Sequence, residues 1–122
     1  MKTNANSLTG AILNYIRYNG SHAERVNNIA RQVKSKSGAM VHIPSANFKG
    51  TADIHAVKKI LLPPLSALKY QIYGQFVAIE VKVGRDKLSE GQEYYRECVQ
   101  KAGGVYMVVH TWDEFIEKWN EI

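Results

Sequence analysis

The residues of this chain whose types and spacing are suited to chemistry are two acids, a lysine and a glutamine. Asp53 comes first, Glu80 and Lys82 follow within one apolar segment, and Gln92 lies further along the chain. Carboxylate oxygens are the ligands that a hard divalent cation such as Mg²⁺ prefers. A lysine beside such a cation could position a water or offset the charge of a phosphate. This set of groups therefore indicates hydrolysis of a phosphodiester.

The segment that carries Glu80 and Lys82 alternates in polarity, which predicts a strand over 76–83. One face of this strand consists of Val77, Ile79, Val81 and Val83. The other face consists of Phe76, Ala78, Glu80 and Lys82. The acid and the lysine would thus project side by side. The same pattern is also typical of a strand with one solvated face, in which the two charges have no chemical role.

The segments after this strand predict a strand, helix and strand in succession. A loop over 84–88 leads to a helix that starts with a capping box at Ser89 and Gln92. Glycines 103 and 104 stop the helix, and a second strand follows over 105–109. Such a crossover joins parallel strands whose faces are covered, so the Glu80 strand should be an inner one. Charges placed there are costly unless they are paired or bind a metal.

Asp53 opens another predicted strand, over 53–57. If this strand pairs with that of Glu80, the two carboxylates lie at neighbouring positions about 5 Å apart at Cβ, close enough to share one cation. Without a metal the two charges would repel. Gln92 would point inward from the first turn of the next helix, toward Lys82, although completing the capping box is reason enough for a glutamine there.

Four stretches of the chain, in this order, resemble the VRR-NUC branch of the PD-(D/E)XK nucleases, and the resemblance covers the chain from about residue 8 to its end. The stretches read Gly-Thr-Ala-Asp-Ile at 50–54, Gly-Gln-Phe-Val-Ala-Ile-Glu-Val-Lys-Val-Gly at 74–84, Ser-Glu-Gly-Gln at 89–92 and Gly-Gly-Val-Tyr at 103–106. The resemblance implies an α/β fold with a restriction-endonuclease-like core, in which a mixed β-sheet is flanked by helices.

The resemblance also implies roles for the residues named above. Asp53 and Glu80 would bind Mg²⁺ or Mn²⁺ together with the backbone carbonyl of Val81. Lys82 would be the catalytic lysine and Gln92 an orienting residue. The chain departs from the family pattern in two places: Ala52 stands where a proline often precedes the aspartate, and the first helix lacks a glutamate near its start. The second departure leaves open whether one or two metal ions bind.

The expected function is metal-dependent hydrolysis of DNA. The resemblance implies a preference for branched, flap or junction DNA, a homodimer, and a bacterial or phage-infected host cell. A second possibility is a non-catalytic nucleic-acid-binding domain that keeps the nuclease fold. A third is an enzyme with the same site that acts on RNA or nucleotides.

Basic residues are concentrated in the first part of the chain. Residues 1–72 hold 10 Lys or Arg and 2 acids, whereas residues 73–122 hold 6 Lys or Arg and 9 acids. Cations on one surface bind backbone phosphates whatever the base sequence, and binding weakens as salt rises. On charge alone a merely soluble basic surface is an equal alternative. The predicted DNA-binding residues are Arg25, Arg31, Lys34, Lys36, Lys49, Lys58 and Lys59.

The length of 122 residues predicts one domain over 1–122, of which residues 1–6 should be flexible. No apolar run after Met1 could serve as a signal peptide, and no run of apolar residues is long enough to cross a membrane, so we expect a cytoplasmic protein without a membrane partner. The single Cys98 is interpreted as a small core residue. Of the histidines, only His55 shares a strand face with Asp53; it could touch substrate, but a surface or core position is favoured.

The first part of the chain predicts one helix and two further strands. An apolar repeat that begins at Leu8 marks a helix ending at Asn19-Gly20. The segments 22–29 and 39–43 are strand candidates. Between them, 31–38 is interpreted as a polar, flexible basic loop that faces DNA.

The segment 58–73 should be an irregular connection, because its two prolines at 63 and 64 disfavour a strand interior. Its apolar residues should cap the core or, as the alternative, form a partner surface; they are Ile60, Leu61, Leu62 and Leu65.

A capping box formed by Thr111 and Glu114 opens a C-terminal helix. The apolar stripe of this helix should pack on the core, and it consists of Trp112, Phe115, Ile116 and Trp119. Trp119 could stack on a base only if it were exposed.

Overall fold

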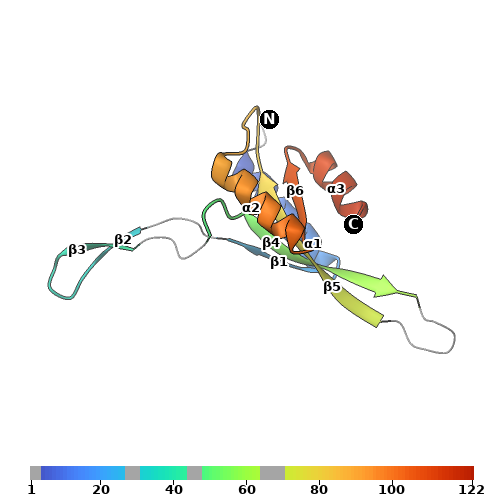
Figure 1. The fold of residues 1–122 in the computed structure, drawn as a ribbon, viewed down its shortest axis with the longest axis horizontal. Coiled ribbons are helices and arrows are strands. Elements are labelled where there is room, and N and C mark those ends of the chain that lie inside the picture. The colour runs from blue at the N-terminus through green and yellow to red at the C-terminus, as the bar shows by residue number, and fades with distance from the viewer. Residues whose placement is uncertain (1–3, 27–30, 44–47, 64–70) are drawn as a thin grey trace.

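The computed structural model describes residues 4–26, 31–43, 48–63 and 71–122. Within these ranges the protein has a mixed α/β fold, in which a four-stranded mixed sheet is accompanied by three helices (Figure 1). This architecture is consistent with the restriction-endonuclease-like core that the sequence predicted.

The main sheet has the strand order β1-β4-β5-β6. These strands are β1 (His22–Arg25), β4 (Ile54–Leu62), β5 (Gln71–Val81) and β6 (Val105–Val109). β4 runs antiparallel to β1 and β5, whereas β5 and β6 are parallel. Helix α2 (Glu90–Lys101) forms the crossover between the two parallel strands. β5 is therefore an inner strand, as expected.

Helices cover both faces of this sheet. On one face, the predicted apolar residues Val77, Ile79 and Val81 join a buried cluster with residues of α1 (Ala5–Tyr18) and α3 (Trp112–Asn120). On the other face, Ala78 packs against Tyr95 and Val99 of α2. The alternation along β5 thus separates two cores, and the face that carries Glu80 is the one under α2.

Helix α1 begins earlier than the sequence indicated. Asn4 is its N-cap and accepts a hydrogen bond from the backbone N–H of Ser7 (2.7 Å). Residues 4–6, which were expected to be flexible, therefore belong to the helix and its cap, because an asparagine side chain satisfies a free N–H of the first turn. Residues 1–3 lie outside the described residues.

Helix α3 begins with an altered capping box. Thr111 accepts from the backbone N–H of Glu114 (3.1 Å), but the Glu114 carboxylate accepts from the backbone N–H of His110 instead of that of Thr111. Phe115 and Trp119 are buried, as predicted for the apolar stripe. Because Trp119 is only 4% exposed, it is not available to stack on a base.

The predicted basic loop over 31–38 is wrong in its first half, over 31–34, and holds over 35–38. β2 (Arg31–Lys34) pairs with β3 (Met40–Ile43) in an antiparallel hairpin, and only the tight turn around Gly38 separates them. Gly38 has a positive φ of 89°, which a turn of this kind requires. Pairing with β3 satisfies the backbone of a segment whose own composition indicated a loop. The remainder of the predicted strand 22–29, beyond residue 26, lies outside the described residues.

The predicted connection over 58–73 is also wrong at both ends. β4 continues to Leu62 and β5 begins at Gln71, so the two strands extend as an antiparallel pair beyond the part that β1 and β6 cover. We call residues 58–62 and 71–76 the β4–β5 arm. Leu61 is 56% exposed and Ile72, opposite it, is 63% exposed. These side chains do not cap the core; Leu65 lies outside the described residues.

Candidate active site

The β4–β5 pairing brings Asp53 and Glu80 together. Ile54 lies opposite Ile79, so Asp53, one residue before β4, comes level with Glu80 on β5. Oδ2 of Asp53 accepts a hydrogen bond from the backbone N–H of Val81 (2.8 Å). The Asp53 carboxylate is therefore fixed at the end of β5, next to Glu80, as the sequence predicted.

Glu80 is buried, with 4% of its surface exposed. Its Oε1 accepts a hydrogen bond from Nε2 of Gln92 (3.0 Å) and lies 3.9 Å from Nζ of Lys82. Its Oε2 is also buried, and no hydrogen-bond donor within the described ranges reaches it. A carboxylate oxygen placed in this way is available to a ligand that the protein does not itself supply.

Burial and the nearby Asp53 carboxylate raise the pKa of Glu80 to about 8, while the Lys82 ammonium acts in the opposite direction. At neutral pH and without a bound cation, Glu80 therefore holds a proton that relieves its repulsion with Asp53. A divalent cation between the two carboxylates would replace that proton. Titratable groups whose pKa is strongly shifted are common in functional sites.

Lys82 lies directly after β5, and its backbone N–H donates to the carbonyl of Val109 (3.0 Å), which continues the pairing with β6. Its side chain is 18% exposed. The ammonium is thus partly removed from solvent and lies beside Glu80, in the position that the alternating pattern predicted.

Gln92 completes the predicted capping box and also contacts Glu80. Its Oε1 accepts from the backbone N–H of Ser89 (2.8 Å), and its backbone N–H donates to Oγ of Ser89 (3.2 Å), which completes the capping box. Its Nε2 donates to Glu80. The amide therefore links the first turn of α2 to Asp53 and Glu80, which we call the acidic pair. It contacts Glu80 instead of pointing to Lys82.

Gly50 is a site residue whose role the sequence did not reveal. Its φ is +81°, and a Cβ at this position would lie 2.2 Å from the carbonyl oxygen of Gly91 and 2.6 Å from the backbone nitrogen of Gln92. The loop before Asp53 therefore lies directly against the first turn of α2, which a side chain would prevent. The spacing Gly-x-x-Asp was the signal for this contact.

The acidic pair suits a hard divalent cation. Two carboxylates lie level on adjacent strands, and a buried carboxylate oxygen has no donor from the described part of the chain. In that part, no three His, Cys, Asp or Glu side chains form a cluster; the ligand set predicted here contains two acids and a backbone carbonyl. The role of the Val81 carbonyl stays a prediction.

Two tyrosines and a histidine lie beside the acidic pair on the same face of the sheet. Nε2 of His55 and the hydroxyl of Tyr95 are 2.9 Å apart. Burial lowers the pKa of His55, which favours the neutral ring. Tyr106 packs edge to face with Tyr95. His55 is thus half-buried and has a partner, as the favoured interpretation of this residue required.

Most of the predicted DNA-binding residues are exposed, but they are not gathered at the acidic pair. Lys49 is near it, because its aliphatic chain lies beside Gly91. The β2–β3 hairpin, which carries Lys34 and Lys36, extends away from the sheet (Figure 1). Arg25 and Lys59 lie on β1 and β4. The Arg31 side chain lies outside what is described.

The ammonium of Lys58 is hydrogen-bonded within the fold, so it is not free to bind DNA as predicted. Its Nζ donates to the carbonyl oxygens of Trp119 (2.6 Å) and Ile122 (3.3 Å) and lies 5.2 Å from the centre of the Trp119 ring. A cation at the C-terminal end of a helix is favourably placed. Lys58 therefore attaches β4 to the end of α3.

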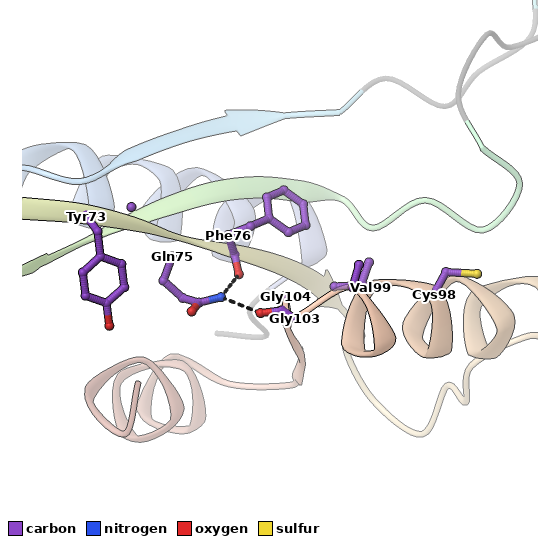
Figure 2. Close-up of a pocket in the computed structure, with 9 residues that line it drawn as sticks. Tyr73, Gln75, Phe76, Cys98, Val99, Gly103 and Gly104 are labelled. Carbon is purple, nitrogen blue, oxygen red and sulfur yellow. Dashed lines mark hydrogen bonds between the residues drawn. The ribbon is translucent and has the colours of Figure 1, made fainter.

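A hollow lies at the other end of α2 from Gln92. It has a volume of about 540 Å³, and Figure 2 shows Gln75 among the residues that line it, with Nε2 donating to the carbonyls of Phe76 and Gly103. Cys98 lines this hollow and is half-buried, so the prediction of a core cysteine is wrong. The acidic pair does not line it.

No protein-family model matches this chain, and neither does any curated protein or solved structure. The resemblance to the VRR-NUC branch therefore stays a prediction from the sequence motifs. None of the helices within the described ranges has the length and apolar character needed to cross a membrane.

Proposed function

We propose that this protein is a Mg²⁺- or Mn²⁺-dependent deoxyribonuclease of the PD-(D/E)XK type, with a VRR-NUC domain that acts on branched, flap or junction DNA in the cytoplasm. The observation that carries the proposal is the buried contact of Asp53 with Glu80, flanked by Lys82 and Gln92. Burying two acids together is unfavourable for the free protein. A bound cation would offset that cost.

In this proposal each residue has a separate task. Asp53 and Glu80, with the carbonyl of Val81, hold the cation, which supplies positive charge to the scissile phosphate and a more acidic water. Lys82 offsets negative charge that develops on the phosphoryl oxygens. Gln92 holds the Glu80 carboxylate by Oε1. Lys49, exposed and next to α2, is the basic residue best placed to bind a neighbouring phosphate.

The test is a cleavage assay with labelled linear, flap, single-stranded and four-way-junction DNA and one matched RNA strand, each with and without Mg²⁺. We expect cleavage of structured DNA with Mg²⁺, and a loss of at least about a thousandfold in Glu80→Gln, since several kcal/mol of transition-state stabilisation would be removed. Glu97→Gln, an exposed change on α2, is the matched control.

The outcomes separate the candidate functions. DNA binding without cleavage in any metal would replace the nuclease by the non-catalytic binding domain. Cleavage confined to the RNA strand would indicate the RNA-directed enzyme. Full activity in Glu80→Gln would show that the acidic pair is not the site.

We also propose a homodimer that forms through the β4–β5 arm. Exposed apolar side chains gather on this arm, and they include Leu61, Leu62, Ile72 and Tyr73. A two-stranded ribbon is marginally stable on its own, and a second arm could cover these side chains. Light scattering should give the mass of a dimer for the wild type and of a monomer for a Leu61→Ser/Ile72→Ser variant. A wild-type monomer at high concentration would contradict the dimer.

A further inference from the structure

Two buried side-chain polar atoms have no hydrogen-bond partner among the described residues: Oε2 of Glu80 and the hydroxyl of Tyr106. Both belong to the face of the sheet under α2. In the parallel pair, Ala78 lies opposite Tyr106 and Glu80 opposite Val108, so Tyr106 is one pleat away from Glu80 on the adjacent strand. Buried polar atoms in native proteins are nearly always paired, with protein or with an ordered water. Two such atoms on neighbouring positions indicate a shared partner.

Tyr95 and Gln92, the two α2 side chains that reach the surroundings of Glu80, already have partners. The hydroxyl of Tyr95 is paired with His55, and both ends of the Gln92 amide are in use. Tyr106 is therefore the neighbour with a hydroxyl to spare. Burial, followed by the Glu80 charge, raises the pKa of Tyr106, so its hydroxyl keeps its proton and can donate.

We propose that Tyr106 is a positioning residue of the acidic pair: an ordered water joins its hydroxyl to Oε2 of Glu80 and forms a hydrogen bond with each of them. The carboxyl group is then held at both oxygens, by Gln92 at Oε1 and by the Tyr106 water at Oε2. The role in metal binding rests on the proposed nuclease function, whereas the hydrogen-bonded water does not. A fixed carboxylate loses less freedom when it binds a cation, so affinity depends on a residue that does not touch the cation.

The test compares Tyr106→Phe, which removes one oxygen atom, with Tyr94→Phe, the same change at an exposed position of α2. A high-resolution crystal structure of the metal-free wild type should contain a water within hydrogen-bond distance of both atoms, and Tyr106→Phe should lack it. Calorimetric titration with Mn²⁺ in the absence of DNA should show an affinity about tenfold weaker in Tyr106→Phe and unchanged in Tyr94→Phe. In the cleavage assay kcat should fall while KM for DNA stays the same.

The outcomes distinguish the inference from the proposed function. A dry gap between the two atoms, or an unchanged Mn²⁺ affinity in Tyr106→Phe, would overturn the positioning role. A fall in melting temperature alone, with Mn²⁺ affinity intact, would assign Tyr106 to packing. If the wild type neither binds Mn²⁺ nor cleaves, the nuclease proposal and the metal role of Tyr106 both fail, and the crystal still decides whether the water joins Tyr106 to Glu80. If Tyr106→Phe does not fold, the wild-type crystal decides the same point.

Discussion

The two ends of the β4–β5 pair differ in what covers them. At one end, β5 from Val77 to Val81 has β4 and β6 on its two edges and helices on both faces, and its acid is buried. At the other end, the same two strands form the β4–β5 arm, where apolar Ile72 is exposed. An acid is inside and apolar side chains are outside, which is the reverse of the usual distribution. Both ends are therefore places where a further binding partner is expected, a cation at one and a protein surface at the other.

The largest effect that tests this comparison comes from the same substitution at both ends of β5. Ile79→Ala should lower the free energy of unfolding by about 2–5 kcal/mol, because Ile79 is fully buried and a cavity remains. Ile72→Ala should change it by less than about 0.5 kcal/mol in the monomer, because Ile72 is exposed. Urea unfolding at low protein concentration measures both. Equal costs would show that the arm packs on the core.

A pH series tests the buried acid. Because the folded protein raises the pKa of Glu80 to about 8 from an ordinary value near 4.5, the folded state holds a proton that the unfolded chain has lost between these values. The metal-free protein should therefore lose stability as pH rises from 4.5 through 8, by up to about 1.4 kcal/mol per pH unit.

Glu80→Gln is the control for this series, since it cannot ionise and its amide oxygen can still accept from Gln92. The variant should lack the decline and should melt above the wild type at pH 9. Thermal unfolding in the presence of a chelator at pH 5, 7 and 9 measures the difference. A wild type that is more stable at pH 9 than at pH 5 would contradict the raised pKa.

Substitution of two glycines that have nearly the same φ tests the contact between the loop at Gly50 and the first turn of α2, which positions Gln92. Gly50 and Gly84 have φ of +81° and +80°, but a Cβ would clash with α2 only at Gly50 and would enter open space at Gly84. Alanine at either site costs about 1 kcal/mol for the left-handed conformation. Gly50→Ala should cost about 1–2 kcal/mol more and should also weaken Mn²⁺ binding. Identical losses in both variants would remove the proposed role of Gly50.

The smallest expected effect is a change in the salt dependence of DNA binding, which should differ between variants of two lysines. Lys49→Ala should reduce the slope of log affinity for DNA against log salt by about 0.9, the value for one phosphate contact on duplex DNA. Lys58→Ala should leave this slope unchanged and lower stability instead, because its ammonium is bonded to the end of α3. Filter binding over a range of salt concentrations separates them. A reduced slope in Lys58→Ala would show that this ammonium leaves Trp119 to bind DNA.

Several features of the fold could be predicted because their signals are local. The alternation over 76–83, the capping box at Ser89 and Gln92, and the glycines after α2 each depend on residues close together in the chain. Together they predicted the parallel crossover and the inner strand that carries Glu80. The sequence predicted that Asp53 and Glu80 would be neighbours if their two strands paired, and the β4–β5 register shows that they do.

The features that the sequence did not reveal depend on pairing partners. Arg31–Lys34 is a strand because β3, just beyond a tight turn, pairs with it, although its own polar composition is typical of a loop. Two other features depend on residues that are distant in the chain. The ammonium of Lys58 is bonded to the end of α3, and β4 continues past its predicted end because β5 supplies backbone partners as far as Leu62.

The sequence by itself determined which residues could do chemistry and the local elements that carry them, because period, caps and turns are properties of neighbouring residues. Only the tertiary structure decided how those residues behave. The raised pKa of Glu80 arises from burial beneath α2, against strands that meet only in the folded chain. The same burial leaves Oε2 of Glu80 and the hydroxyl of Tyr106 without a partner among the described residues. Desolvation and hydrogen bonding depend on what surrounds a group in space, and that environment exists only after folding.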